Sequence, residues 1–287
     1  PTIPNSKLSE LEKKIDATQE ECSVTHARRK LIEEEVSRYI TSTNTPYGRE
    51  IHLSMASILM HRYAKRTPQI GLFEGEQEDF EPSKPLKADS DLLDGAKIHL
   101  LHQFDRPYYF GFDALCDAAS ENAEQLLQLS AILVDQLETN CIRRKRATLL
   151  ARDQHRLLNT RAVEMIEEWD YPFFPQVRAM CEGIALQCIQ KSLEPNASLG
   201  GGATGFGIPQ EEFERIPKDF PSLARVLQFG SAYNAFTLVP NKSVKNRLWC
   251  LVDLGGPFRV KSGLTFRYGN FIERTVKDLL PFVEGIK

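Results

Sequence analysis

One stretch of the chain, residues 173–254, constrains the fold more than any other, because its patterns of helix and strand follow a specific order. The order is helix, strand, helix, helix, strand and strand, predicted at residues 176–193, 206–209, 210–216, 221–233, 235–240 and 247–254. Six residues, 241–246, separate the last two strands, and five of them are polar, including two lysines. This is the element order of a winged helix, with residues 241–246 as its wing.

Length and composition describe the class of protein around this stretch. The chain has 287 residues, enough for two compact domains, and its 41% hydrophobic and 26% charged residues are typical of a soluble protein. A net charge of −3 argues against a uniformly basic surface, so any surface that binds nucleic acid must be local. No apolar run approaches the roughly 18 residues of a membrane span, so we expect no transmembrane helix and no membrane partner.

Six cysteines are spread along the chain without a C-x-x-C pair, which favours free, buried thiols in a reducing cytoplasm over disulfides or a metal site. The first residues show no signal-peptide pattern and no initiator methionine. We therefore expect a cytoplasmic protein whose sequence is here an excerpt of a longer one.

The predicted fold class is mainly α with a small β component, a helical lid or arm region followed by a winged-helix domain. Helical spacing covers most of the first forty residues and residues 50–64, and a second helical region contains a leucine-rich helix near residues 123–137. An acidic stretch that can bury little separates these regions. The predicted parts are a helical arm or hairpin, an acidic exposed loop, a lid-like helical region, and a winged-helix domain with a C-terminal extension, at residues 1–70, 71–91, 92–170 and 171–287.

No strong catalytic signature occurs in the sequence. A G-x-G-x-x-G pattern at Gly200, Gly202 and Gly205 lacks the preceding strand and following helix of a dinucleotide site, so we interpret it as a connector. No Gly-Lys pair exists, which excludes a phosphate-binding P-loop within this chain. His99 and His102 could share a metal, but no ligand cluster completes the shell. We expect no catalytic residue, no metal and no cofactor in this chain.

Two groups of basic residues are candidates for nucleic-acid contact. One is the run at residues 143–146, extended by Arg152, Arg156 and Arg161. The other surrounds the wing, where lysine and arginine can neutralise phosphates with little dependence on base sequence. The predicted nucleic-acid-binding residues are Lys242, Lys245 and Arg247 at the wing and Arg225 on the preceding helix. An ordinary solvated basic surface or a protein-docking face remains the alternative.

Residues 108–115, with the sequence YYFGFDAL, and residues 119–129, with ASENAEQLLQL, carry a resemblance to a known family. They resemble the helical lid of bacterial AAA+ ATPases of the origin-recognition-like (STAND-related) family, in which an aromatic-Gly-Phe-Asp turn leads to a leucine-rich helix and then a winged helix. The likeness covers about residues 104–280. It implies an ATPase domain elsewhere that binds ATP and Mg²⁺ and forms a homo-oligomer. It also allows a role in bacterial antiphage defence.

One position departs from the family pattern. Asn122 matches the asparagine of the family motif, but the sensor arginine that reaches the nucleotide falls at Glu124. A carboxylate there would repel phosphate instead of stabilising it. The departure puts direct ATP contact from this region in doubt.

Two functions follow as expectations. The first is the C-terminal regulatory part of a AAA+-type ATPase, which binds DNA or a partner protein through the winged helix. The alternative is a free-standing winged-helix DNA-binding regulator whose N-terminal helices form a dimerisation arm. In either case the last wing strand should alternate, with Trp249 and Leu251 on one side, Leu248 and Cys250 on the other, and one of these pairs facing the helices.

Overall fold

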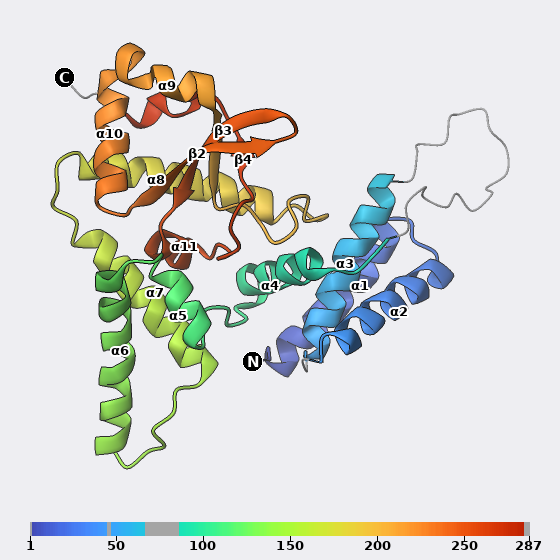
Figure 1. The fold of residues 1–287 in the computed structure, drawn as a ribbon. Helices are drawn as coiled ribbons and strands as arrows, with labels where there is room; N and C mark the ends of the chain where they lie inside the picture. Colours follow the sequence, from blue (N-terminus) through green and yellow to red (C-terminus); the bar gives the residue numbers. More distant parts are fainter. Residues whose placement is uncertain (1, 45–46, 67–85, 284–287) are drawn as a thin grey trace, which may run out of the picture. The chain divides into compact units, whose positions relative to one another are not determined.

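The computed structural model describes residues 2–44, 47–66 and 86–283, and the chain falls into two compact units (Figure 1). The first unit combines Pro1–Arg106 with Ser192–Gly201, and the second combines Pro107–Lys191 with Gly202–Lys287. The architecture is mainly α with one small sheet, as the sequence predicts. The unit boundaries differ from the predicted ones, and most of the predicted acidic loop lies outside the described residues.

The described part of the first unit is helical. Its helices are α1 (Asn5–Glu21), α2 (His26–Ser42), α3 (Arg49–Arg66) and α4 (Ser90–Phe104). The helix predicted over the first forty residues is thus two helices, and Thr25 caps the second by accepting a hydrogen bond from the Arg28 backbone N–H. Both helices pack on α3, half of whose residues are buried. The described residues of the predicted helical arm or hairpin, 1–70, therefore form helices that pack in one core.

The packing of helix α4 explains why the boundary between the units at Arg106 and Pro107 falls inside the predicted region 92–170. Leu92, Leu100 and Phe104 are buried and belong to the same hydrophobic cluster as the N-terminal helices. The predicted lid-like region, residues 92–170, is consequently divided. Its first helix belongs to the first unit, and the remainder from Pro107 onward belongs to the second unit together with residues 171–191 and 202–287.

The second unit begins with helices and continues into the segment with the winged-helix order. The elements are α5 (Phe112–Ala118), α6 (Ala123–Ile142), α7 (Ala151–Glu167), α8 (Phe174–Ser192), β1 (Gly205–Pro209), α9 (Gln210–Asp219), α10 (Pro221–Ala232), β2 (Phe236–Val244), β3 (Arg247–Leu254), α11 (Gly256–Ser262) and β4 (Ile272–Glu273), followed by 3₁₀ turns at Val276–Asp278 and Leu280–Phe282. From α8 to β3 the order of elements is the one that the sequence predicts.

Hydrogen bonds through α11 join the first helices of this unit to the rest of it. The backbone N–H of Gly256 donates to the Ser120 hydroxyl at 2.6 Å, and the Asn159 amide donates to the Val260 carbonyl at 3.0 Å. The buried Tyr109 hydroxyl donates to the Leu264 carbonyl at 2.6 Å. These contacts explain why residues 107–170 and the segment that holds the sheet form a single unit.

The sheet has the strand order β2-β3-β1-β4, with β2, β3 and β1 antiparallel and β4 parallel to β1. Both of its faces are covered around β3. Phe236 contacts Gly230 of α10 on one face, and on the other Phe271 packs on Trp249 with ring centroids 5.6 Å apart. Trp249, Cys250 and Leu251 are therefore all buried, and only Leu248 of the predicted alternating set is exposed. The two pairs lie on opposite faces of β3, and the pair of Leu248 and Cys250 shares the face on which Phe236 contacts α10.

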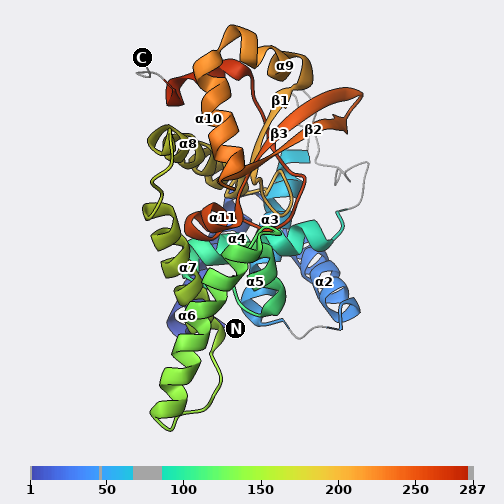
Figure 2. The ribbon, with the colours of Figure 1, turned by 60° about the vertical axis from the view of Figure 1, so that its left-hand side comes forward.

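The leucine-rich helix α6 is less buried than its pattern suggests. Among its residues only Leu129 is buried, whereas Leu127 and Ile142 are 71% and 83% exposed. Helices α6 and α7 pack along each other and extend away from the sheet (Figures 1 and 2). Their broad apolar faces serve mainly this pairing, which leaves one side of α6 in solvent. None of the described helices is both long and apolar enough to cross a membrane.

Candidate functional site: a basic hairpin and a pocket in the second unit

The β2–β3 hairpin holds three of the four predicted contact residues. Its strands continue to Val244 and from Arg247, so the connecting turn is only Lys245 and Asn246. Both turn residues have positive φ, 49° and 62°, as in a type I′ turn. The prediction of a six-residue loop at 241–246 was therefore wrong, because β2 runs four residues further than its apolar pattern.

A bulge explains why β2 does not end at Pro240. The register passes from Val239 paired with Leu251 to Lys242 paired with Trp249, so two residues of β2 face one of β3. Asn241 in this bulge has a φ of 58°, and its backbone N–H donates to the Gln210 side-chain oxygen at 3.0 Å. The hairpin is thus attached to the first residue of α9.

Two of the cations share a face of the hairpin and lie against aromatic rings. Lys242 is paired with Trp249 and Val244 with Arg247, so the side chains of all four lie on the same face. The Lys242 ammonium is 5.5 Å from the ring centroid of Tyr268, and the Arg247 guanidinium is 4.7 Å from that of Trp249. Cation–π attraction at these distances holds both charges in place without neutralising them.

The hairpin itself carries little negative charge. From β2 to the end of β3 the only carboxylate is Asp253, which is buried at the base of the hairpin. It accepts hydrogen bonds from the Arg259 guanidinium at 2.5 Å and the Thr204 hydroxyl at 2.6 Å. Burial raises the pKa of this carboxyl above its ordinary value, and Arg259 opposes the shift. Among the described residues, no carboxylate forms an ion pair with Lys242, Lys245 or Arg247.

Arg225, the fourth predicted residue, is exposed on α10. Helix α10 and the tip of the hairpin lie apart in both views of the unit (Figures 1 and 2). The structure therefore brings Lys242, Lys245 and Arg247 together and does not bring Arg225 to them. In the second basic group, Arg161 is engaged by Glu164 and Glu168, whereas Arg152 and Arg156 are exposed.

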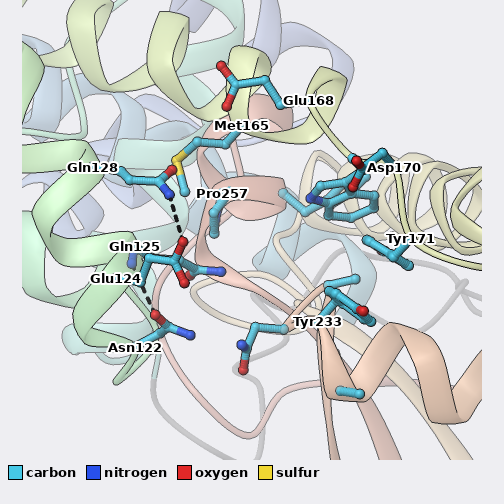
Figure 3. Close-up of a pocket in the computed structure, with 15 residues that line it drawn as sticks. Asn122, Glu124, Gln125, Gln128, Met165, Glu168, Asp170, Tyr171, Tyr233 and Pro257 are labelled. Carbon is cyan, nitrogen blue, oxygen red and sulfur yellow. Dashed lines mark hydrogen bonds between the residues drawn. The ribbon is translucent and has the colours of Figure 1, made fainter.

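A pocket of about 340 Å³ lies elsewhere in the second unit, where the start of α6 meets the ends of α7 and α10 and the start of α11 (Figure 3). Its polar lining is made of carboxylates and amides, its apolar lining of aromatic and smaller apolar side chains, and neither lysine nor arginine lines it. The lining residues are Asn122, Glu124, Gln125, Gln128, Met165, Glu168, Trp169, Asp170, Tyr171, Ala232, Tyr233, Asn234, Ala235, Pro257 and Phe258. Sequence reasoning did not find this pocket, because it is assembled from four separate segments.

Glu124 is one of three carboxylates in the lining, with Glu168 and Asp170. Asn122 caps α6 by accepting a hydrogen bond from the Gln125 backbone N–H at 3.0 Å. A phosphate in this pocket would meet negative charge from several directions. The pocket therefore does not suit the phosphates of a nucleotide.

The histidines that could share a metal, and the cysteines, were also candidates for a site. His99 is buried, its Nε2 lies 3.1 Å from the Ser192 carbonyl, and no group of three or more metal-ligating side chains gathers in the described ranges. All six cysteines lie in the described residues, and none of them forms a disulfide. Cys181, Cys188 and Cys250 are buried as expected, but Cys141 is exposed at the end of α6, so the expectation of buried thiols was wrong there.

The glycine pattern at residues 200–205 leads into β1 instead of a helix, so it lacks the context of a dinucleotide site. No protein-family model, curated protein or solved structure matches this chain.

Proposed function

We propose that this chain is the C-terminal regulatory part of a AAA+-type ATPase and that its second unit binds nucleic acid as a winged helix, with the β2–β3 hairpin as the wing. The observation that carries the binding proposal is the cluster of Lys242, Lys245 and Arg247 on a hairpin whose only carboxylate is buried. Such a cluster binds phosphates by releasing their counterions.

The contacts would be made to the phosphate backbone more than to bases. In winged-helix and related modules, a recognition helix reads the major groove through polar side chains. Helix α10 exposes few of these, chiefly Arg225 and Gln228. A hairpin that presents cations at a two-residue turn is better suited to a groove edge, so affinity should depend strongly on salt and weakly on sequence.

The ATPase part of the proposal rests on the resemblance of residues 108–129, which form the turn before α5, α5 itself and the first part of α6. On this view ATP and Mg²⁺ bind in a separate domain, through which the protein forms a homo-oligomer, and the second unit couples nucleotide state to DNA or a partner protein. A role in antiphage defence belongs to the same proposal.

The alternative, a free-standing regulator with an N-terminal dimerisation arm, has less support. Leu11 and Ile15 of α1 and Ile32 and Val36 of α2 are buried in the core of the first unit. The apolar stripes that would form a dimer interface are therefore already occupied within the chain.

The test is fluorescence anisotropy with labelled duplexes of unrelated sequence, measured over a range of salt concentrations. The triple variant Lys242→Glu, Lys245→Glu and Arg247→Glu should lose duplex binding. A matched variant, Lys13→Glu, Lys30→Glu and Lys65→Glu, makes the same change in net charge on exposed residues of the first unit and should bind as the wild type does. Unchanged affinity in the hairpin variant would refute the proposal.

A further inference from the structure

The pocket shown in Figure 3 has an excess of negative charge that the chain does not neutralise. Of its three carboxylates, Glu168 is bound by the Arg161 guanidinium at 2.9 Å. Glu124 accepts only a neutral hydrogen bond, from the Gln128 amide at 3.2 Å. Asp170 has no hydrogen bond or ion pair in the part of the chain that the structure describes. Two carboxylates are therefore available to a ligand.

Helix ends add to this negative potential. Glu168 is the C-cap of α7 and Tyr233 is the C-cap of α10, so two helix C-termini, each with partial negative charge, meet at the pocket. The N-terminus of α6 has the opposite polarity. Asn122 satisfies one of its backbone N–H groups and Glu124 lies in its first turn, so its positive end is largely offset.

Aromatic rings form one wall of the pocket. The ring centroid of Trp169 is 5.3 Å from that of Tyr171 and 5.5 Å from that of Phe258. Tyr171 stacks on Tyr233 with centroids 4.1 Å apart and an interplanar angle of 7°. Tyr233 is 49% exposed, so part of its ring is open to solvent. Aromatic faces beside carboxylates are the usual surroundings of a bound organic cation.

A buried acceptor in the lining also lacks a donor. The Gln125 side-chain oxygen is buried and receives no hydrogen bond from any described residue. Buried polar atoms in native proteins nearly always have a hydrogen-bond partner, so this unpaired oxygen calls for an explanation. Ammonium and guanidinium groups only donate hydrogen bonds, so they match the Gln125 oxygen once its side chain turns that atom towards the pocket.

We propose that this pocket binds the cationic head of an alkylammonium or alkylguanidinium ligand, with Glu124 and Asp170 as counter-charges and Trp169 and Tyr233 as the aromatic wall. Its volume of about 340 Å³ is within the range of small-ligand sites. The head group can belong to a free amine or to a lysine or arginine side chain of a peptide. This site is separate from the basic hairpin and does not depend on nucleic-acid binding.

The test is calorimetric titration of the whole chain with agmatine, which carries both head groups, and with the peptide acetyl-Gly-Arg-Gly-amide, against a sodium chloride blank. Saturable binding of either probe is expected. A peptide that binds at least about tenfold more tightly than agmatine identifies a side chain as the natural source, and similar affinities identify a free amine. Absence of binding by both probes overturns the proposal.

Variants then locate the binding. The pair Glu124→Gln and Asp170→Asn should weaken affinity by about tenfold, because it removes both exposed counter-charges of the ligand. Tyr233→Leu should weaken it about threefold through the lost cation–π contact, without any change in charge. The control pair Asp135→Asn and Glu138→Gln changes two exposed carboxylates of α6 outside the pocket and should leave affinity unaltered. Equal losses in control and pocket pairs would overturn the proposal.

Discussion

The guanidinium of Arg247 lies 4.7 Å from the ring centroid of Trp249, and the two residues share one face of the β2–β3 hairpin. The same indole packs on Phe271 and is only 4% exposed. Trp249 therefore has two roles, since it joins the hairpin to the C-terminal segment and supports a cation at the proposed contact surface. Substitutions at Trp249 should change mainly the free energy of unfolding, and substitutions at Arg247 mainly the duplex affinity, so the two roles can be measured separately.

Trp249→Ala should lower the free energy of unfolding of the second unit by about 3–5 kcal/mol, because the substitution leaves a cavity beside Phe271. Leu248→Ala, at the neighbouring position that is 49% exposed, should cost less than about 1 kcal/mol. Urea denaturation of both variants, followed by circular dichroism, measures the two losses. Equal losses would mean that the indole is not part of the core.

Neutral substitutions at the hairpin should reduce duplex affinity and its salt dependence together. Lys245→Gln and Arg247→Gln should each lower the slope of log affinity against log salt by about 1, as expected when one phosphate contact is lost. Arg225→Gln should leave the slope unchanged, because α10 does not lie beside the hairpin tip. Anisotropy titrations at several salt concentrations compare the three. If the slope decreases for Arg225→Gln and for neither hairpin variant, the contact surface lies on α10 instead of the hairpin.

The turn at Lys245 and Asn246 places a lysine where the backbone favours asparagine or glycine. Its φ of 49° lies in the left-handed region, which is unfavourable for a side chain that cannot hydrogen-bond to the local backbone. Lys245→Asn should therefore raise the free energy of unfolding by about 0.5–1 kcal/mol while it weakens duplex binding. Thermal denaturation and anisotropy on the same preparation check both effects. A variant that is both less stable and weaker in binding would contradict this assignment of strain.

Local pattern was enough to predict most elements of the second unit. Helices α8 and α10 and strands β1 and β3 begin and end within about two residues of the predicted ranges, because their apolar spacing is regular. Strand β2 was predicted too short. Pro240 and Asn241 look like a strand end, and only the register against β3 shows that they form a bulge.

Other features depend on tertiary packing and leave little trace in the sequence. The apolar face of α6 predicts burial, yet α7 covers only part of it and Leu127 remains exposed. The division into two units depends on where α4 packs, which its own pattern does not specify. The acidic pocket draws Glu124 and Tyr233 from positions more than a hundred residues apart, so no motif search would have joined them.

The pH dependence of the first unit should reflect His99. Burial, which outweighs its hydrogen bond with the Ser192 carbonyl, lowers the pKa of His99 to about 4. In the unfolded chain the imidazole titrates near 6.5, so acid favours the unfolded state, which takes up the proton first. The contribution of this group to stability is complete above about pH 6.5 and is lost as the pH falls towards 4.

His99→Gln removes this titration and keeps a side-chain amide that can donate to the Ser192 carbonyl. The difference in unfolding free energy between wild type and variant should change by up to about 3 kcal/mol between pH 7 and pH 4, with the wild type losing more in acid. Gln103→Asn, which changes an exposed and uncharged side chain of the same helix, is the control and should follow the wild type. Urea denaturation across this pH range gives all three profiles. Parallel curves for wild type and His99→Gln would show that the imidazole gains its proton in the folded state as readily as in the unfolded one.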